Sequence, residues 1–116
     1  MNDGRHEPPR EEWRELFEKL TNEFDGYDVT IEVVGEQLGD HLEAEGLPLA
    51  YLAYDDKDDV FIVAVGGRDG RYPELHHMID SPQRILADSV SPDVPWAIDV
   101  TGPGTRTIVS LRRPAA

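Results

Sequence analysis

The chain has 116 residues, a length typical of one domain. It contains no cysteine, which excludes disulfides, thiolate zinc sites, iron–sulfur clusters and cysteine nucleophiles. Its 24 acidic residues outnumber the 11 basic ones, and the formal net charge of −13 repels phosphate backbones and anionic membrane surfaces. We therefore expect a partner that is neither nucleic acid nor membrane.

The acidic surface is also poor in lysine, since Lys19 and Lys57 are the two lysines of the chain. Such a composition is typical of proteins adapted to high internal salt, where a Debye length of about 3 Å at 1 M screens self-repulsion. An ordinary acidic bacterial protein is the alternative. No apolar run approaches the roughly 18 residues of a membrane span, and the N-terminus shows no apolar signal core, so a soluble, cytoplasmic protein is expected.

The N-terminal part is predicted to form a flexible tail followed by one helix. Residues 1–8 carry no apolar periodicity, so the tail is assigned there. Over residues 9–25 apolar side chains recur at the helical period, which predicts one amphipathic helix. These side chains are Trp13, Leu16, Phe17, Leu20 and Phe24.

Residues 26–112 show the pattern of short strands. The most apolar segment, 60–65, is too short for an ordinary helix and is expected near the middle of the fold, covered on both faces. Gly46-Leu47-Pro48 marks a bulge, a bend or a short break, Ser81-Pro82 marks an interruption or a corner, and Gly102-Pro103-Gly104 predicts a hairpin. The predicted strands are 27–33, 40–45, 49–54, 60–65, 75–79, 83–88, 96–101 and 105–112.

The predicted fold class is α+β, with residues 1–116 forming a single domain. No second helix is predicted that could connect parallel strands, so sequential antiparallel pairing is expected. The N-terminal helix then packs on a strongly bent antiparallel sheet of six to eight strands, because a flat sheet of this length would expose its edges. A half-open small barrel is the more closed version of the same arrangement.

Several short motifs occur in a recognisable order along most of the chain. They are Arg10-Glu11-Glu12-Trp13, Val29-Thr30-Ile31-Glu32-Val33, Leu47-Pro48-Leu49, His77-Met78-Ile79-Asp80-Ser81-Pro82-Gln83-Arg84-Ile85 and the hairpin Ala97-Ile98-Asp99-Val100 to Thr107-Ile108-Val109-Ser110-Leu111-Arg112. This order resembles a family of small bacterial and archaeal proteins known only as a domain of unknown function. The resemblance implies a shared fold and no particular activity.

The candidate ligand-binding residues are His77, Arg68, Arg71 and Arg84. The arginines are able to hold a small anion through bidentate hydrogen bonds. Arg68 and Arg71 lie in a glycine-rich stretch, but this stretch lacks the spacing of a phosphate-binding loop. No serine occupies a nucleophile motif, and we assign no catalytic residue and no cofactor.

A metal site is a weaker alternative. His76 and His77 are adjacent on a predicted strand, so they point to opposite faces and cannot readily bind one ion. His41, His77 and Asp80 are the alternative set of metal ligands. The four aspartates at 55, 56, 58 and 59 lack EF-hand spacing and indicate a solvated turn.

The sequence favours a small, acidic, non-catalytic binding or interaction protein whose partner is a protein, a second copy or a small molecule bound on the concave face of the sheet. The alternative is a small metal- or ligand-binding enzyme that uses His76 or His77, His41 and nearby carboxylates. Monomer and homodimer both remain open.

The charge balance predicts salt-dependent stability. Lowering the salt from about 2 M to about 0.02 M lengthens the Debye length roughly tenfold, so repulsion among the carboxylates should lower the melting temperature. Differential scanning calorimetry in KCl measures this change. An equal melting temperature at both salt concentrations would contradict adaptation to salt.

Overall fold

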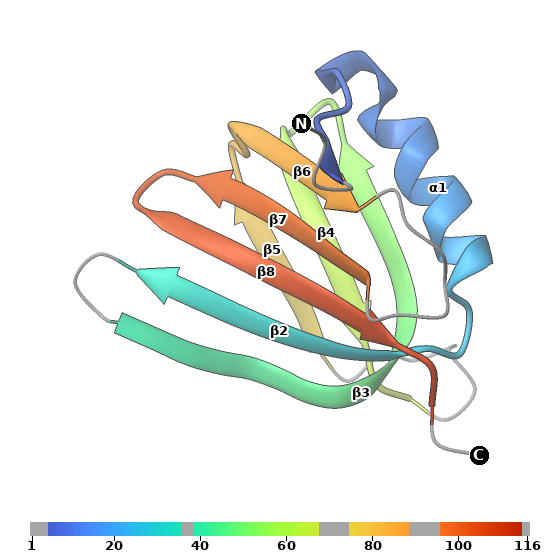
Figure 1. Ribbon diagram of the computed structural model, residues 1–116. Coiled ribbons are helices and arrows are strands. Elements are labelled where there is room, and N and C mark those ends of the chain that lie inside the picture. The colour runs from blue at the N-terminus through green and yellow to red at the C-terminus, as the bar shows by residue number, and fades with distance from the viewer. Residues whose placement is uncertain (1–4, 36–38, 68–74, 89–95, 115–116) are drawn as a thin grey trace.

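The computed structural model describes residues 5–35, 39–67, 75–88 and 96–114. The chain runs through one helical region and eight strands, coloured from blue to red in Figure 1. The elements are β1 (Arg5–His6), the 3-10 turn η1 (Arg10–Glu12), α1 (Trp13–Glu23), β2 (Asp28–Gly35), β3 (Gly39–Asp55), β4 (Val60–Val65), β5 (Leu75–Asp80), β6 (Arg84–Asp88), β7 (Trp96–Gly102) and β8 (Thr105–Arg112). No helix in the described part of the chain is long and apolar enough to cross a membrane.

The strands form one antiparallel sheet in the order β1-β6-β7-β8-β2-β3-β4-β5. Its outer strands, β1 and β5, are not paired with each other, so the sheet is bent but open. The α+β prediction of one N-terminal helix on an antiparallel sheet of six to eight strands is confirmed. β1 lies within the stretch predicted as a tail. β4 lies second from the edge of the sheet, and Val63, Ala64 and Val65 are fully buried, as expected for a segment near the middle of the fold.

The long strand β3 folds the sheet over itself. Its first part pairs with β2 as far as Pro48, and its second part pairs with β4 from Leu49 onward. Register shifts interrupt both the β2–β3 and the β3–β4 ladder. Gly46 has a φ of 65°, a backbone conformation that would be strained in a residue with a side chain. Of the bulge, bend or short break expected at Gly46-Leu47-Pro48, the structure shows a bend within one continuous strand. In Figure 1, β4 and β5 consequently lie behind β7 and β8.

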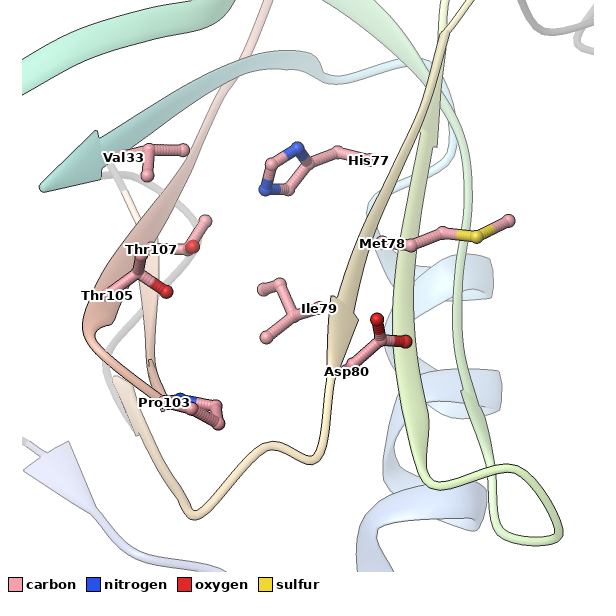
Figure 2. Close-up of a pocket in the computed structure, with 8 residues that line it drawn as sticks. All are labelled: Val33, His77, Met78, Ile79, Asp80, Pro103, Thr105 and Thr107. Carbon is pink, nitrogen blue, oxygen red and sulfur yellow. The ribbon is translucent and has the colours of Figure 1, made fainter. Parts of the chain in front are cut away.

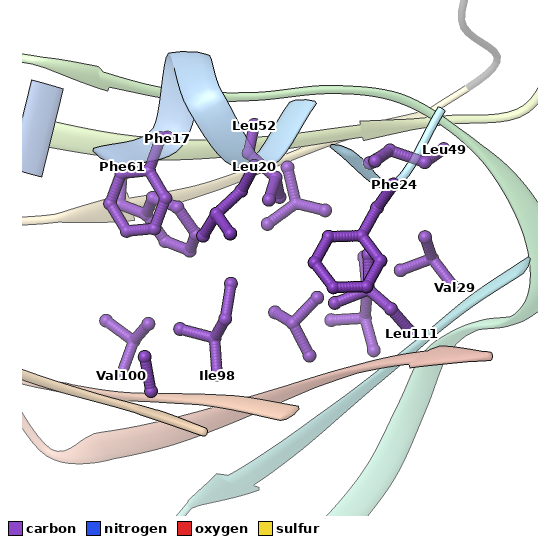
Figure 3. Packing of buried hydrophobic residues seen from close by; sticks show 14 of the residues in the cluster. Phe17, Leu20, Phe24, Val29, Leu49, Leu52, Phe61, Ile98, Val100 and Leu111 are labelled. Atoms are coloured by element: carbon purple, nitrogen blue, oxygen red, sulfur yellow. The ribbon is translucent and has the colours of Figure 1, made fainter. Parts of the chain in front are cut away.

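The core fills the space between the two layers, and α1 closes one of its open sides. The ring centroids of Phe17 and Phe61 lie 4.7 Å apart, and those of Phe24 and Trp96 lie 4.9 Å apart. Figure 3 shows the helix side chains between the two layers, with Ile98 and Val100 on the opposite strand. The apolar stripe predicted from the sequence is thus the side of the helix that is buried.

Thr21 of α1 protects the edge of β3 that faces the helix. Beyond Pro48 this edge has no strand partner, because β2 pairs only with the first part of β3. The backbone N–H of Leu52 donates to Thr21 Oγ1 at 2.9 Å. The Thr21 hydroxyl lies 3.0 Å from the Leu52 carbonyl and 2.7 Å from the Phe17 carbonyl, its two possible acceptors. One side chain thereby hydrogen-bonds an exposed strand edge.

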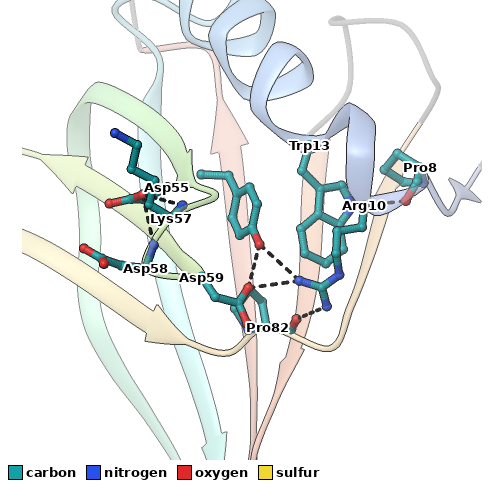
Figure 4. A network of polar contacts seen from close by, with 9 residues as sticks. Pro8, Arg10, Trp13, Asp55, Lys57, Asp58, Asp59 and Pro82 are labelled. Atoms are coloured by element: carbon teal, nitrogen blue, oxygen red, sulfur yellow. Dashed lines mark hydrogen bonds and ion pairs between the residues drawn. The ribbon is translucent and has the colours of Figure 1, made fainter.

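Arg10 connects the start of the helical region to two distant turns (Figure 4). Its guanidinium donates to Tyr54 Oη at 3.1 Å, to Asp59 Oδ1 at 2.9 Å and to the Pro82 carbonyl at 2.8 Å. It also lies 4.4 Å from the centroid of the Trp13 ring. The β3–β4 turn and the β5–β6 corner are thus held against the same planar group.

Replacing Thr21 by valine should destabilise the protein by about 1–3 kcal/mol, because the Leu52 N–H loses its acceptor while the shape of the side chain is kept. Urea unfolding measures the free-energy change. Thr101→Val is the matched control on the outer face of β7 and should change stability by less than about 0.5 kcal/mol. Equal effects of the two variants would show that the edge contact contributes nothing.

Replacing Arg10 by lysine should cost about 1 kcal/mol, since an ammonium group cannot reproduce the planar set of donors and the two ionic side chains remain partly exposed. The control is Arg14→Lys, because Arg14 lies 4.0 Å from Asp56 and is 67% exposed. Thermal unfolding of both variants gives the comparison. If Arg10→Lys is as stable as Arg14→Lys, the network is not a significant stabilising contact.

Candidate functional site

The second open side of the folded sheet contains a cavity of about 320 Å³. It lies between the edge strand β5 and the paired strands β2 and β8, and we call it the seam cavity (Figure 2). The β7–β8 hairpin bounds it at one end, where a side chain on Gly102 would come within 3.1 Å of Ile79. The lining residues are Val33, His77, Met78, Ile79, Asp80, Pro103, Thr105 and Thr107.

Strand register explains which side chains face this cavity. His77 is opposite Val63, whose side chain is fully buried, so His77 lies on the inner face of β5. Val33 of β2 is likewise opposite Thr107 of β8, and both continue the inner face of their strands. Met78 and Asp80 belong to the lining, but their side chains extend from the other face of β5 (Figure 2).

The polar groups of the cavity have no partner within the described part of the protein. Thr107 is 1% exposed, and neither its hydroxyl nor that of Thr105 makes a hydrogen bond to a described residue. The same holds for the two ring nitrogens of His77, whose imidazole points across the cavity in Figure 2. Thr105 is exposed, His77 is half-buried, and no fully buried side-chain nitrogen or oxygen of the described residues lacks a partner, so these groups are open to the cavity. Their convergence on an apolar cavity marks it as the candidate site.

The electrostatic surroundings keep His77 neutral. Burial lowers the pKa of His77 below its ordinary value, the nearby Glu43 carboxylate opposes this shift, and His41 adds to it. His41 and Glu43, both on β3, contact each other at 2.9 Å between Nε2 and Oε1. At neutral pH one His77 nitrogen is therefore a donor and the other an acceptor.

The predicted metal ligands do not come together. His41 and His77 interact electrostatically, but Asp80 lies on the opposite face of β5 from His77. Within the described ranges no three histidine, aspartate or glutamate side chains form a group able to hold a metal ion. His76 lies on the outer face, with its ring centroid 5.9 Å from that of Tyr51, which agrees with the prediction that the adjacent histidines point apart.

Of the three predicted arginines, Arg84 is the one within the described residues, and it does not line the seam cavity. Arg84 donates from Nε to Glu7 Oε1 at 2.9 Å and is absent from the cavity lining. Arg68 and Arg71 lie outside the described residues. Sequence reasoning missed Thr105 and Thr107, although their position on the same alternating face as Val109 and Leu111 was a usable signal.

One buried carboxylate lies outside the seam cavity and is accounted for by an ion pair. Asp99, on the outer face of β7, is 8% exposed and accepts hydrogen bonds from Arg106 of β8. The Asp99 contact raises the pKa of the Arg106 guanidinium. The paired carboxylate is fully engaged, so we do not include it among the candidate functional groups.

Comparison with known proteins assigns a family without a known activity. A protein of Aquifex aeolicus (strain VF5), described as uncharacterized, is 32% identical over 105 residues, which cover 90% of this chain and 88% of that protein. No solved structure matches. The model of the family of unknown function DUF5335 matches residues 5–116. The chain therefore belongs to the family of unknown function DUF5335.

Proposed function

We propose that this protein is a non-catalytic binding domain whose ligand is a small molecule in the seam cavity. The volume of about 320 Å³ lies at the lower end of the range of about 300–1,000 Å³ found for ligand pockets. Its walls are mostly apolar, and a few polar groups converge on it, which is the usual composition of such pockets. His77, one of the ligand-binding residues expected from the sequence, is the contact on β5.

The observation that carries this proposal is the Thr107 hydroxyl. Thr107 is 1% exposed and its hydroxyl makes no hydrogen bond to a described residue, yet no fully buried side-chain oxygen of the described residues lacks a partner, so this hydroxyl is open to the cavity. Valine would occupy the same space without a polar group to satisfy. Ile31 and Val109, the next inward pair along the same two strands, are both fully buried and apolar. A ligand that hydrogen-bonds the hydroxyl accounts for threonine at this position.

Binding is supported better than catalysis because none of the described residues hydrogen-bonds His77 so as to orient it as a general base. A catalytic histidine is normally held by a carboxylate or a carbonyl within hydrogen-bond distance. The nearby carboxylate of Glu43 contacts His41 instead. The alternative function, an enzyme that uses His76 or His77, His41 and nearby carboxylates, would depend on this His41–Glu43 pair. The two side chains are 42% and 36% exposed, so water screens the interaction between them.

The test is Thr107→Val. Removing the hydroxyl should leave the stability of the ligand-free protein unchanged or raise it by up to about 1 kcal/mol in urea unfolding, because the hydroxyl has no hydrogen bond to a described residue to lose. The same variant should weaken binding of benzyl alcohol, followed by methyl chemical shifts of Val33 and Ile79, by about 2- to 10-fold.

Thr101→Val, on the outer face of β7, is the matched control and should leave both stability and binding unchanged. If Thr107→Val destabilises the protein, the hydroxyl is bonded within the fold and the proposal fails. Methyl shifts confined to residues outside the seam cavity would also reject it.

A further inference from the structure

Building on the proposed function, we infer that the ligand of the seam cavity is an uncharged, partly apolar small molecule that carries a hydroxyl or carbonyl group. The inference concerns the chemical class of the ligand and depends on the lining residues. Each of their properties restricts the class in a different way.

The walls select an apolar body. Val33 is 8% exposed and Ile79 is 6% exposed, so each presents little surface except toward the cavity and the core. Pro103 completes this wall at the β7–β8 hairpin. A fully hydrated ligand would lose water at these contacts without gaining hydrogen bonds, whereas an apolar ring or chain gains free energy from burial.

The polar groups select a ligand atom that accepts or exchanges hydrogen bonds. The hydroxyls of Thr105 and Thr107 both donate and accept, and neutral His77 offers one donor and one acceptor. A ligand hydroxyl satisfies either role, and a ligand carbonyl accepts from any of the three donors. A purely apolar ligand would displace water from these groups without replacing its hydrogen bonds, so it should bind more weakly than a ligand with a hydroxyl or carbonyl.

The charges exclude ionic ligands. Among the described lining residues there is no lysine or arginine, and the whole chain carries a formal net charge of −13. An anion would therefore lose hydration without meeting a cation. A cation would find no free carboxylate, because Glu43 contacts His41 and the side chain of Asp80 extends from the outer face of β5.

Three probes with the same aromatic ring and different charges test this inference. Benzyl alcohol, benzoate and benzylammonium are titrated separately into the protein at pH 7.5, and the methyl shifts of Val33 and Ile79 report occupancy of the seam cavity. We expect benzyl alcohol to bind at least tenfold more tightly than either ion. Purely apolar toluene serves as a fourth probe and should bind more weakly than benzyl alcohol.

The pKa of His77, measured by NMR titration, identifies the charge of the bound molecule independently of affinity. An uncharged ligand excludes water from the imidazole and lowers this pKa further, whereas a bound anion raises it. Because the ligand meets the neutral ring, the affinity for benzyl alcohol should fall as the pH drops through the pKa of ligand-free His77. Glu43 and His41 also face this ring. The pH dependence of binding is therefore also measured in His41→Gln, which separates the effect of this pair from that of His77.

Matched histidine variants complete the design. His77→Gln keeps a polar side chain that cannot be protonated, and it should abolish the acid loss of affinity, while His76→Gln on the outer face should preserve it. If benzoate binds more tightly than benzyl alcohol and raises the pKa of His77, the inference is wrong, but the proposed binding function stands. Arg68 and Arg71, which lie outside the described residues, would then be the first candidates for the cation that binds the carboxylate. Failure of all four probes at tens of millimolar would reject both the inference and the proposed function.

Discussion

The fold depends on one strand, β3, which belongs to both layers of the folded sheet. β3 gives one edge to β2 up to Pro48 and the opposite edge to β4 from Leu49. Pro48 has no backbone N–H to donate, so the change of partner occurs where the ladder is already weakened. The apolar faces of β4 and β7 then enclose a common core, which a flat sheet of the same strands could not form.

The two open sides of the folded sheet are treated differently. On one side, aromatic residues of α1 fill the gap and Thr21 bonds the unpaired edge of β3. On the other side, the described residues leave the seam cavity next to β5. The side closed by α1 is sealed by its own side chains, whereas the side chains of His77 and Thr107 line the seam cavity.

The position of the seam cavity could be only partly anticipated from sequence. His77 was recognised because a histidine is chemically distinctive, and its inward orientation follows from the alternation that places His76 outside. Thr105 and Thr107 look like ordinary residues of a strand edge in the sequence. Their place in the seam cavity depends on β5 lying across the inner face of β8, and that arrangement is produced by the bend in β3 rather than by any local pattern.

The sequence by itself determined the helix, its buried stripe, the final hairpin and the antiparallel character of the sheet, because hydrophobic period, glycine and proline act over a few residues. Only the tertiary structure decided that 40–45 and 49–54 form one strand, that β8 returns to pair with β2, and that β4 lies near an edge. Those features depend on pairing between segments far apart in the chain, where many registers satisfy the same alternation and packing of the common core selects one.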